Sequence, residues 1–417
     1  MTDGPRPLNL RELAGTVRAP AKPSGPRRVD APLLAPAVLE DLARWLASAQ
    51  ERDVPAPLRR PRLVVLAGDH GVAAAGVSRL APGDTARAVR DLLAGRGPTA
   101  ALAAEVGVGV AVHALGVDWD AGDSPAADTD APDPGADPDA GRVPGVPEPV
   151  TRHAVRAGSG DVRHEDAMTA EQTEAALRTG AAIADTEVDE GADLLVLGDL
   201  GVGATTVAAA LVAACLRKNA VDVVGRGSGV DDDGWMRKTA AVRDATRRAR
   251  KLATRPVALL QAVGSPDVAA AVGFLLRASA RRTPVLLDGA VSLAAALVAS
   301  RGVPGAEGWW RVGARTAEPA QALAAERLKL VPLLDLGAGR GGGTGALAAV
   351  PLLRAAQVLA AADAASAPRA AAPAAVGPGG AGGTGEVQPE EPGPREPEEH
   401  EPTREEPAPG PGTAPAG

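Results

Sequence analysis

Short apolar runs alternate with longer helix-like stretches along most of this chain. The short runs lie at residues 62–66 (RLVVL), 109–115 (GVAVHAL), 194–197 (LLVL) and 284–287 (PVLL). Stretches of helical length and pattern lie around and between them, at residues 36–50, 97–106, 170–190, 206–216, 232–254, 268–280 and 292–300. Because parallel strands need long crossover connections, this alternation predicts a doubly wound, mostly parallel α/β sheet with helices on both faces. Ligands of such sheets bind at the carboxyl ends of the strands.

The composition excludes several other classes of protein. The single cysteine, Cys215, excludes a disulfide scaffold and a cysteine-based zinc site. Residues 1–30 lack the apolar core of a secretory signal. The longest apolar runs are broken by charge, glycine or proline, so we expect no transmembrane helix and no membrane partner. Together these features predict a cytoplasmic protein.

Acidic residues are concentrated in two segments that are rich in proline, glycine and alanine. Residues 118–149 have a net charge of −8 and residues 386–406 one of −7, so the rest of the chain carries +7. Segments of this composition bury too little apolar surface to fold. We therefore predict a flexible N-terminus at 1–30, a folded domain at 31–366 with a disordered insertion at 118–149, and a disordered tail at 367–417.

The mildly basic remainder suits an anionic small molecule. Its Lys and Arg residues are scattered, except in the short run at residues 247–251. With five Trp, one Phe and no Tyr, the chain also lacks the aromatic platforms that bind single-stranded nucleic acid. We expect no nucleic-acid partner.

Two loops that follow predicted strands combine glycines with polar residues. Residues 67–78 (AGDHGVAAAGVS) contain Asp69, His70 and Ser78, and residues 198–206 (GDLGVGATT) contain Gly201, Gly203, Thr205 and Thr206. Glycine loops let backbone N–H groups approach a phosphate, and a following helix adds its positive end. Ordinary turns fit the same residues, with Asp69 as a helix cap, and the second loop lacks the G-K-[ST] of a Walker A motif.

Two later segments extend this pattern. Residues 224–238 (VGRGSGVDDDGWMRK) contain Gly225, Arg226, Gly227, Ser228 and Lys238. Residues 337–345 contain six glycines and Thr344, and an apolar helical stretch follows. A flexible linker would have a similar composition, but periodic apolar sequence flanks this loop on both sides, which favours a loop within the fold.

In their order and spacing these segments resemble the nicotinate-nucleotide–dimethylbenzimidazole phosphoribosyltransferase family of cobalamin biosynthesis. That family shows AGDHGV, GEMGIGNTT, VGRGTG…K, PVLLDG, SAEP and PLLDLG…GEGTGA. This chain has AGDHGV at 67–72, GDLGVGATT at 198–206, VGRGSG at 224–229 with Lys238, PVLLDG at 284–289, TAEP at 316–319 and PLLDLG…GGGTGA at 332–346. The resemblance extends over about residues 33–362.

The resemblance implies transfer of phosphoribose from nicotinate mononucleotide to 5,6-dimethylbenzimidazole, with inversion at the anomeric carbon. The products would be α-ribazole phosphate and nicotinate, and the resemblance implies no metal and no cofactor. It also implies a homodimer, with a small helical part from about residues 31–60 and 320–366 and a large α/β part at 61–319. Positions that match phosphate-binding residues are Gly201, Gly203, Thr205, Thr206, Arg226, Lys238 and Thr316. Further matching substrate positions are Asp69, His70, Ser78, Gly225, Gly227, Ser228, Asp288, Gly289, Glu318, Gly341, Gly343 and Thr344.

The chain departs from the family pattern at the positions closest to the chemistry. Gly342 stands where the family carries its catalytic Glu, and Asp199 stands in place of the Glu of GEMG. Ala204 replaces an Asn, and Ala314 and Gln321 replace histidines that flank SAEP. A general base contributes about 10²–10⁴-fold to a rate. Asp199 is therefore the candidate base, with Asp69 as a second candidate, either of them acting through a water molecule.

Two alternatives to this activity remain open at the level of sequence. One is a related enzyme that uses the same nucleotide with another acceptor or leaving group. The other is a catalytically weakened paralogue that binds nucleotide in a regulatory or partner role.

Overall fold

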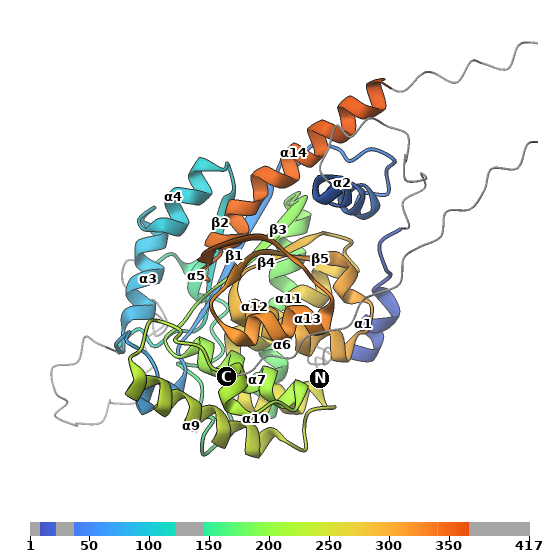
Figure 1. The fold of residues 1–417 in the computed structure, drawn as a ribbon. Coiled ribbons are helices and arrows are strands. Elements are labelled where there is room, and N and C mark those ends of the chain that lie inside the picture. Colours follow the sequence, from blue (N-terminus) through green and yellow to red (C-terminus); the bar gives the residue numbers. More distant parts are fainter. Residues whose placement is uncertain (1–8, 22–36, 122–145, 340, 367–417) are drawn as a thin grey trace, which may run out of the picture. The chain divides into compact units, whose positions relative to one another are not determined.

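Six parallel strands form one sheet in the described residues, hydrogen-bonded in the order β2-β1-β3-β4-β5-β6 (Figure 1). The computed structural model describes residues 9–21, 37–121, 146–339 and 341–366. The strands are β1 (Pro61–Gly68), β2 (Gly109–Gly116), β3 (Leu194–Leu200), β4 (Val285–Leu287), β5 (Trp310–Thr316) and β6 (Pro332–Gly339).

The chain winds outward from β1 in both directions. Leu63 of β1 lies opposite Val110 of β2 on one side and Val196 of β3 on the other. After β2 the chain returns past β1 to form β3, and β4, β5 and β6 then extend that side of the sheet. The winding direction therefore reverses beside β1, and open α/β sheets bind ligands at such a reversal point.

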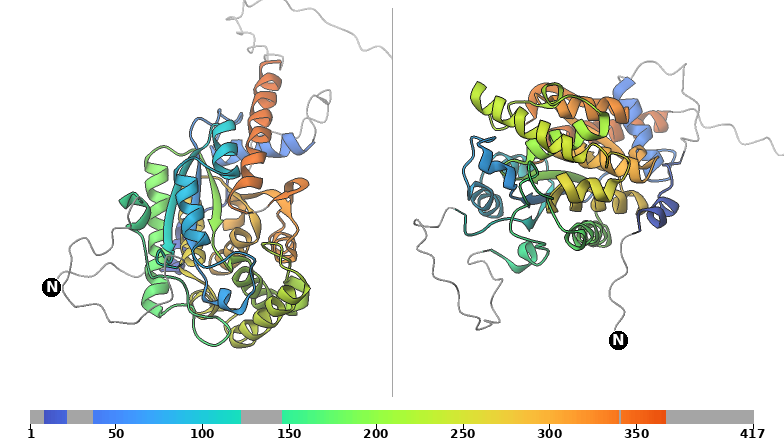
Figure 2. Two further views of the ribbon diagram at one scale, coloured as in Figure 1. Left: turned by 90° about the vertical axis from the view of Figure 1, so that its left-hand side faces the viewer. Right: turned by 90° about the horizontal axis from the view of Figure 1, so that it is seen from below.

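Alternate residues of β1 enter two different hydrophobic cores, because successive side chains of a strand point to opposite faces. Val64 and Leu66 join a core that contains residues of α6 (Ala170–Asp189), α7 (Ala204–Leu216), α11 (Pro266–Ala280) and α12 (Gly289–Gly302). Leu63 and Val65 join a core that contains residues of α2 (Ala37–Ala49), α3 (Asp84–Leu93), α4 (Pro98–Glu105) and α14 (Thr344–Ser366). The views in Figures 1 and 2 show helices on both sides of the sheet, which confirms the predicted doubly wound fold.

Further helical elements complete the described part of the chain. They are α1 (Leu10–Thr16), η1 (Gly71–Ala75), α5 (Glu148–Thr151), α8 (Ala220–Val223), α9 (Asp232–Ala249), α10 (Pro256–Val263), η2 (Ala306–Trp309) and α13 (Pro319–Leu328). Strands β5 and β6 do not follow from the sequence pattern. Arginine and glycine interrupt WRVGART, and glycine and aspartate interrupt PLLDLGAG, so neither segment shows a clean strand pattern.

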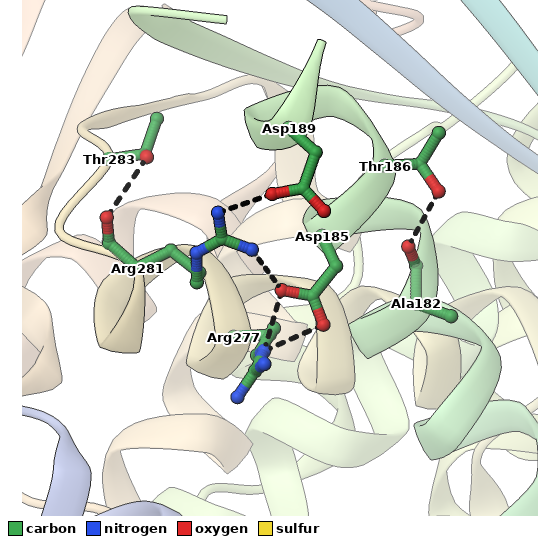
Figure 3. A network of polar contacts seen from close by, with 7 residues as sticks. All are labelled: Ala182, Asp185, Thr186, Asp189, Arg277, Arg281 and Thr283. Atoms are coloured by element: carbon green, nitrogen blue, oxygen red, sulfur yellow. Dashed lines mark hydrogen bonds and ion pairs between the residues drawn. The ribbon is translucent and has the colours of Figure 1, made fainter. Parts of the chain in front are cut away.

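Helices α6 and α11 pack together through two glycines. A Cβ atom at Gly180 would lie 1.8 Å from the carbonyl oxygen of Ala270, and one at Gly273 would lie 2.0 Å from that of Leu177. At the other end of the contact, Asp185 of α6 binds Arg277 of α11 and Arg281, the residue that follows α11, as Figure 3 shows. This packing fixes α11, whose first turn lies against the carboxyl end of β1.

Helix α14 is long and apolar enough, by length and composition alone, to cross a membrane. The sequence pattern predicts an apolar helical stretch here and no transmembrane helix. Ala346, Leu347, Val350 and Leu353 are fully buried in the core on one face of the sheet, which is the packing of a core helix. The apolar character of α14 is therefore explained by burial within the fold.

Much of the chain that was predicted to be flexible or disordered lies outside the described residues. This applies to residues 122–145 of the predicted insertion and to the whole predicted tail at 367–417. The described edges of the insertion contact the fold. The backbone N–H of Asp118 donates to Asp69 Oδ2 over 3.0 Å, and α5 begins at Glu148.

Candidate active site

Loops from five strands meet at the carboxyl edge of the sheet. They place Asp69 after β1, Gly201 after β3, Asp288 after β4, Glu318 after β5 and Gly341 after β6. Their backbones approach so closely that glycine is required at the contacts. A Cβ atom at Gly201 would lie 2.2 Å from the carbonyl oxygen of Gly68, and one at Gly289 would lie 3.1 Å from Gly341 Cα.

Lys238 and Thr205 form the centre of a cradle for an anion. Lys238 of α9 is fully buried, and its Nζ donates to Thr205 Oγ1 over 2.9 Å. Burial lowers the pKa of Lys238, while the carboxylate of Glu318, 3.6 Å away, opposes that shift. Thr205 lies in the first turn of α7, where the positive end of the helix also favours an anion. We call Thr205, Gly227, Lys238 and the start of α7 the anion cradle.

Glu318 occupies this cradle in the structure. Its Oε1 accepts a hydrogen bond from the N–H of Gly227 over 2.7 Å, and its Oε2 has no hydrogen-bond partner. A Cβ atom at Gly225 would lie 2.4 Å from Glu318 Oε1, and one at Gly227 would lie 2.7 Å from Thr205 Oγ1. The carboxylate shows by its contacts that the cradle accepts negatively charged oxygen atoms.

Other predicted residues of this region are held within the loops. Ser78 Oγ and Ser228 Oγ lie 3.1 Å apart and join the loop after η1 to the loop before α9. Arg226 donates to the carbonyl of Val230 over 3.0 Å and pairs with Asp232, so its guanidinium binds its own segment. Thr206 is buried, and its hydroxyl has no hydrogen-bond partner.

The loop after β5 is held by the side chain of Gln321. The backbone N–H and the hydroxyl of Thr316 both donate to Gln321 Oε1, over 2.6 and 2.8 Å. The amide nitrogen of Gln321 donates to the carbonyl of Ala314 over 2.8 Å. Gln321 thus gives Thr316 and Glu318 a defined backbone.

Two carboxyl groups, the half-buried Asp199 and the fully buried Asp288, lie at the ends of β3 and β4. Burial raises the pKa of Asp199 to about 7, and the negative charges of Asp288 and Asp267 add to this rise. Asp199 Oδ1 is shielded from solvent and has no hydrogen-bond partner. Burial also raises the pKa of Asp288 to about 6, while its Oδ2 accepts the N–H of Gly343 over 2.9 Å. A carboxyl group with a pKa near neutrality is suited to accept a proton from a substrate.

The glycine loop after β6 lies directly over Asp199. Gly341, Gly342 and Gly343 have φ angles of 80°, 67° and 92°. A Cβ atom at Gly341 would lie 3.6 and 3.8 Å from the two carboxylate oxygens of Asp199, and the backbone of Gly342 opposes the rise in the pKa of that carboxyl. A Cβ atom at Gly342 would lie 3.5 Å from Thr99 Oγ1, so there is space for a side chain although the backbone disfavours one.

Asp69 and His70 support the neighbouring loops from within the fold. The hydroxyl of Thr85 donates a hydrogen bond to Asp69 Oδ1. The same hydroxyl oxygen accepts a hydrogen bond from the N–H of Val202 over 3.0 Å. His70 is 2% exposed, and its Nδ1 lies 3.0 Å from the carbonyl oxygen of Val202. The predicted Asp–His pair therefore lies in this region, with both side chains bonded to protein groups.

Sequence reasoning missed two residues of this arrangement, Thr85 and Asp267. Asp267 lies in the first turn of α11, is 2% exposed, and places its Oδ1 3.4 Å from His70 Nε2. An acidic residue in the first turn of a helix is common, so Ser-Pro-Asp at residues 265–267 gave no signal beyond a helix start. No group of three or more His, Cys, Asp or Glu within the described ranges is arranged to hold a metal ion.

Comparison with known proteins gives a consistent set of relatives. A family model described as phosphoribosyltransferase matches residues 27–368. A nicotinate-nucleotide–dimethylbenzimidazole phosphoribosyltransferase of Mycolicibacterium paratuberculosis is 49% identical over 318 residues, which are 76% of this chain and 84% of that protein. The enzyme of the same name from Streptomyces avermitilis is 48% identical over 324 residues, which are 78% of this chain and 80% of that protein.

Solved structures agree with the sequence relatives. The crystal structure of a protein of the same name from Thermus thermophilus has a TM-score of 0.66 and 33% sequence identity. The match covers 84% of this chain and 95% of that one.

Proposed function

This chain belongs to the nicotinate-nucleotide–dimethylbenzimidazole phosphoribosyltransferase family, and we propose that it transfers phosphoribose from nicotinate mononucleotide to 5,6-dimethylbenzimidazole. The products are α-ribazole phosphate and nicotinate. The observation that carries the proposal is the presence of an anion cradle and two carboxyl groups of raised pKa at one edge of the sheet.

The anion cradle binds the 5′-phosphate of the nucleotide. Lys238 supplies a buried positive charge, and the Gly227 N–H and the start of α7 supply further donors. Glu318 leaves these donors when phosphate arrives, because two anions in one buried site repel each other.

Asp199 acts as the general base. One ring nitrogen of the benzimidazole attacks C1′ with its lone pair while the bond from C1′ to the pyridinium nitrogen of nicotinate breaks. The electron pair of that bond goes to the leaving nitrogen, which becomes neutral. Asp199 takes the proton from the second ring nitrogen of the acceptor, so the product ribazole is also neutral. The pKa of about 7 keeps a large part of Asp199 ionised at neutral pH and leaves it basic enough to accept the proton.

Asp288 supports the same step by its charge. Its pKa of about 6 leaves it ionised at pH 7.5, and the N–H of Gly343 fixes its position. The transition state carries positive charge at C1′ and the ring oxygen of the ribose. A fixed negative charge nearby stabilises that state more than the ground state.

The finer features of the protein follow from the resemblance to the family. We propose that the chain acts as a homodimer in the cytoplasm, without a metal or cofactor. We also propose the division into a small helical part and a large α/β part.

The direct test incubates the full chain with nicotinate mononucleotide and 5,6-dimethylbenzimidazole and measures α-ribazole phosphate by liquid chromatography and mass spectrometry. We expect turnover by the wild type and a loss of about 10²–10⁴-fold in kcat for Asp199→Asn, with little change in nucleotide affinity. A panel of other purine and benzimidazole acceptors is tested in parallel. Nucleotide binding without turnover of any acceptor would contradict the proposal and favour a weakened paralogue.

A further inference from the structure

Both ring nitrogens of the buried His70 face hydrogen-bond acceptors. Nδ1 lies 3.0 Å from the carbonyl oxygen of Val202, and Nε2 lies 3.4 Å from Asp267 Oδ1. A carbonyl cannot donate, so Nδ1 must carry a hydrogen. A neutral ring would then direct the lone pair of Nε2 at a carboxylate in a site without solvent. A charged ring removes this repulsion, so the ion-pair contact with the Asp267 carboxylate favours the imidazolium form.

The charged groups around His70 agree with this protonation state. Although burial by itself lowers the pKa of His70, the negative charge of Asp267, with smaller contributions from Val202 and Asp69, raises it overall. Burial likewise disfavours the charged form of Asp267, yet His70 holds the pKa of that carboxyl below its usual range. The same positive charge lies close enough to Asp199 to oppose the rise of its pKa.

Asp267 reaches His70 only because β1 ends in a glycine. A Cβ atom at Gly68 would lie 2.8 Å from Asp267 Oδ1, so any other residue would displace the carboxylate. From the opposite end of α11, Arg277 and Arg281 tie the helix to α6 through Asp185 (Figure 3). The carboxylate is thus fixed by backbone packing on one side and by the position of its helix on the other.

The two backbone polar groups of Val202, in the turn formed by Gly201, Val202 and Gly203, are both bonded to side chains. The carbonyl of Val202 accepts from His70, and the N–H of Val202 donates to Thr85 Oγ1 over 3.0 Å. The neighbouring residues, Gly201 and Gly203, have no side chains that could stabilise the turn. A Cβ atom at Gly201 would in fact lie 2.8 Å from His70 Cε1. The turn that leads into α7 and Thr205 therefore depends on contacts from outside itself.

We propose that Asp267 is a positioning residue, which keeps His70 charged and so holds the Val202 turn and the start of α7 in the geometry that binds the nucleotide phosphate. The inference rests on the proposed function for the identity of the ligand. It assigns Asp267 no contact with the substrate. Loss of its charge should weaken nucleotide binding and leave the acceptor site unchanged.

The test uses the full chain with Asp267→Asn, which keeps the shape of the side chain and removes its charge. Binding of nicotinate mononucleotide is measured by calorimetry, and KM for each substrate by steady-state kinetics. We expect the Kd and KM for the nucleotide to rise about tenfold or more, since hydrogen bonds of charged groups exceed neutral ones. The KM for the acceptor should change less than about twofold. The matched control is Asp91→Asn, which removes the exposed ion pair with Arg96 far from the nucleotide site and should change neither KM value.

The protonation of His70 is measured independently by ¹⁵N NMR of histidine-labelled protein, with the His70 signals assigned from a His70→Gln sample. At neutral pH the wild type should show hydrogens on both ring nitrogens, and Asp267→Asn a hydrogen on Nδ1 alone. A neutral His70 in the wild type would overturn the inference, and this measurement does not depend on whether any variant folds. Unchanged nucleotide affinity in Asp267→Asn would also overturn it. If the wild type binds the nucleotide but shows no turnover, the proposed reaction is wrong. The role of Asp267 is still tested in that case, because nucleotide affinity and the NMR spectra do not depend on turnover.

Discussion

The two carboxylate oxygens of Asp199 lie 3.6 and 3.8 Å from the position that a Cβ atom of Gly341 would take, under the glycine loop after β6. The carboxyl group of Asp199 is thus covered by glycines, which bring no side chain of their own. Its unpaired Oδ1 and its pKa of about 7 suit it to the proton transfer of the proposed reaction.

The pH dependence of the reaction should report Asp199. A base acts in its ionised form, so protonation below a pKa of about 7 removes activity. We expect kcat/KM to rise with pH through about 7 and to level off above it. Steady-state kinetics between pH 5 and pH 9 measures this, with the stability of the protein checked at each pH. In Asp199→Asn the rise should disappear. An equal rise near pH 7 in that variant would assign the titration to another group.

Asp199→Asn should stabilise the fold at alkaline pH. Because the native pKa of Asp199 is raised from 3.8 to about 7, its favourable contribution is complete below the unfolded value and is lost as the pH rises through the native value. The amide has no charge to bury, so Tm should rise by about 2 °C or more at pH 8. At pH 4 the two proteins should differ little. Thermal unfolding followed by circular dichroism measures both. A variant that is less stable at both values would show that Asp199 serves the fold.

Lys238→Ala should weaken nucleotide binding far more than acceptor binding. A surface ion pair contributes about 0–1 kcal/mol to a binding free energy, which corresponds to at most about fivefold in affinity. The contribution of Lys238 should be larger, because its side chain is fully buried. We expect a loss of about tenfold or more in affinity for nicotinate mononucleotide, measured by calorimetry. The exposed Lys218→Ala is the control and should bind normally. If the wild type and Lys238→Ala bind nicotinate mononucleotide with equal affinity, the anion cradle is not the phosphate site.

Gly342→Glu should restore activity to a protein that lacks Asp199. In the Asp199→Asn background the new carboxylate would lie beside the acceptor, and we expect kcat to rise about tenfold or more, within the range of general bases. The φ of 67° at Gly342 opposes a side chain, so some loss of stability should accompany the gain. The matched variant is Gly342→Gln, which has similar size and no basic carboxylate. An equal gain for Gln would attribute the effect to packing.

Local sequence patterns were sufficient for the strands that carry continuous apolar runs. β1, β3 and β4 follow directly from RLVVL, LLVL and PVLL, because strands buried on both faces need apolar residues throughout. Strand β5 could not be predicted in this way. Its residues pair with β4 from Val285 to Leu287, and this pairing is decided by neighbours distant in sequence.

The candidate site divides in the same way. The sequence by itself determined which loops are glycine-rich and which polar residues they carry, because a tight turn or a close backbone approach requires those residue types locally. The tertiary structure alone decided that Asp267 pairs with His70, that Arg226 binds its own segment, and that Asp199 lies beneath Gly342. These residues lie far apart along the chain, or have side chains that could bond to several different partners, so the sequence alone does not specify the pairing. Their distances, and the burial that shifts the pKa of Asp199, exist only once the helices have packed against the sheet.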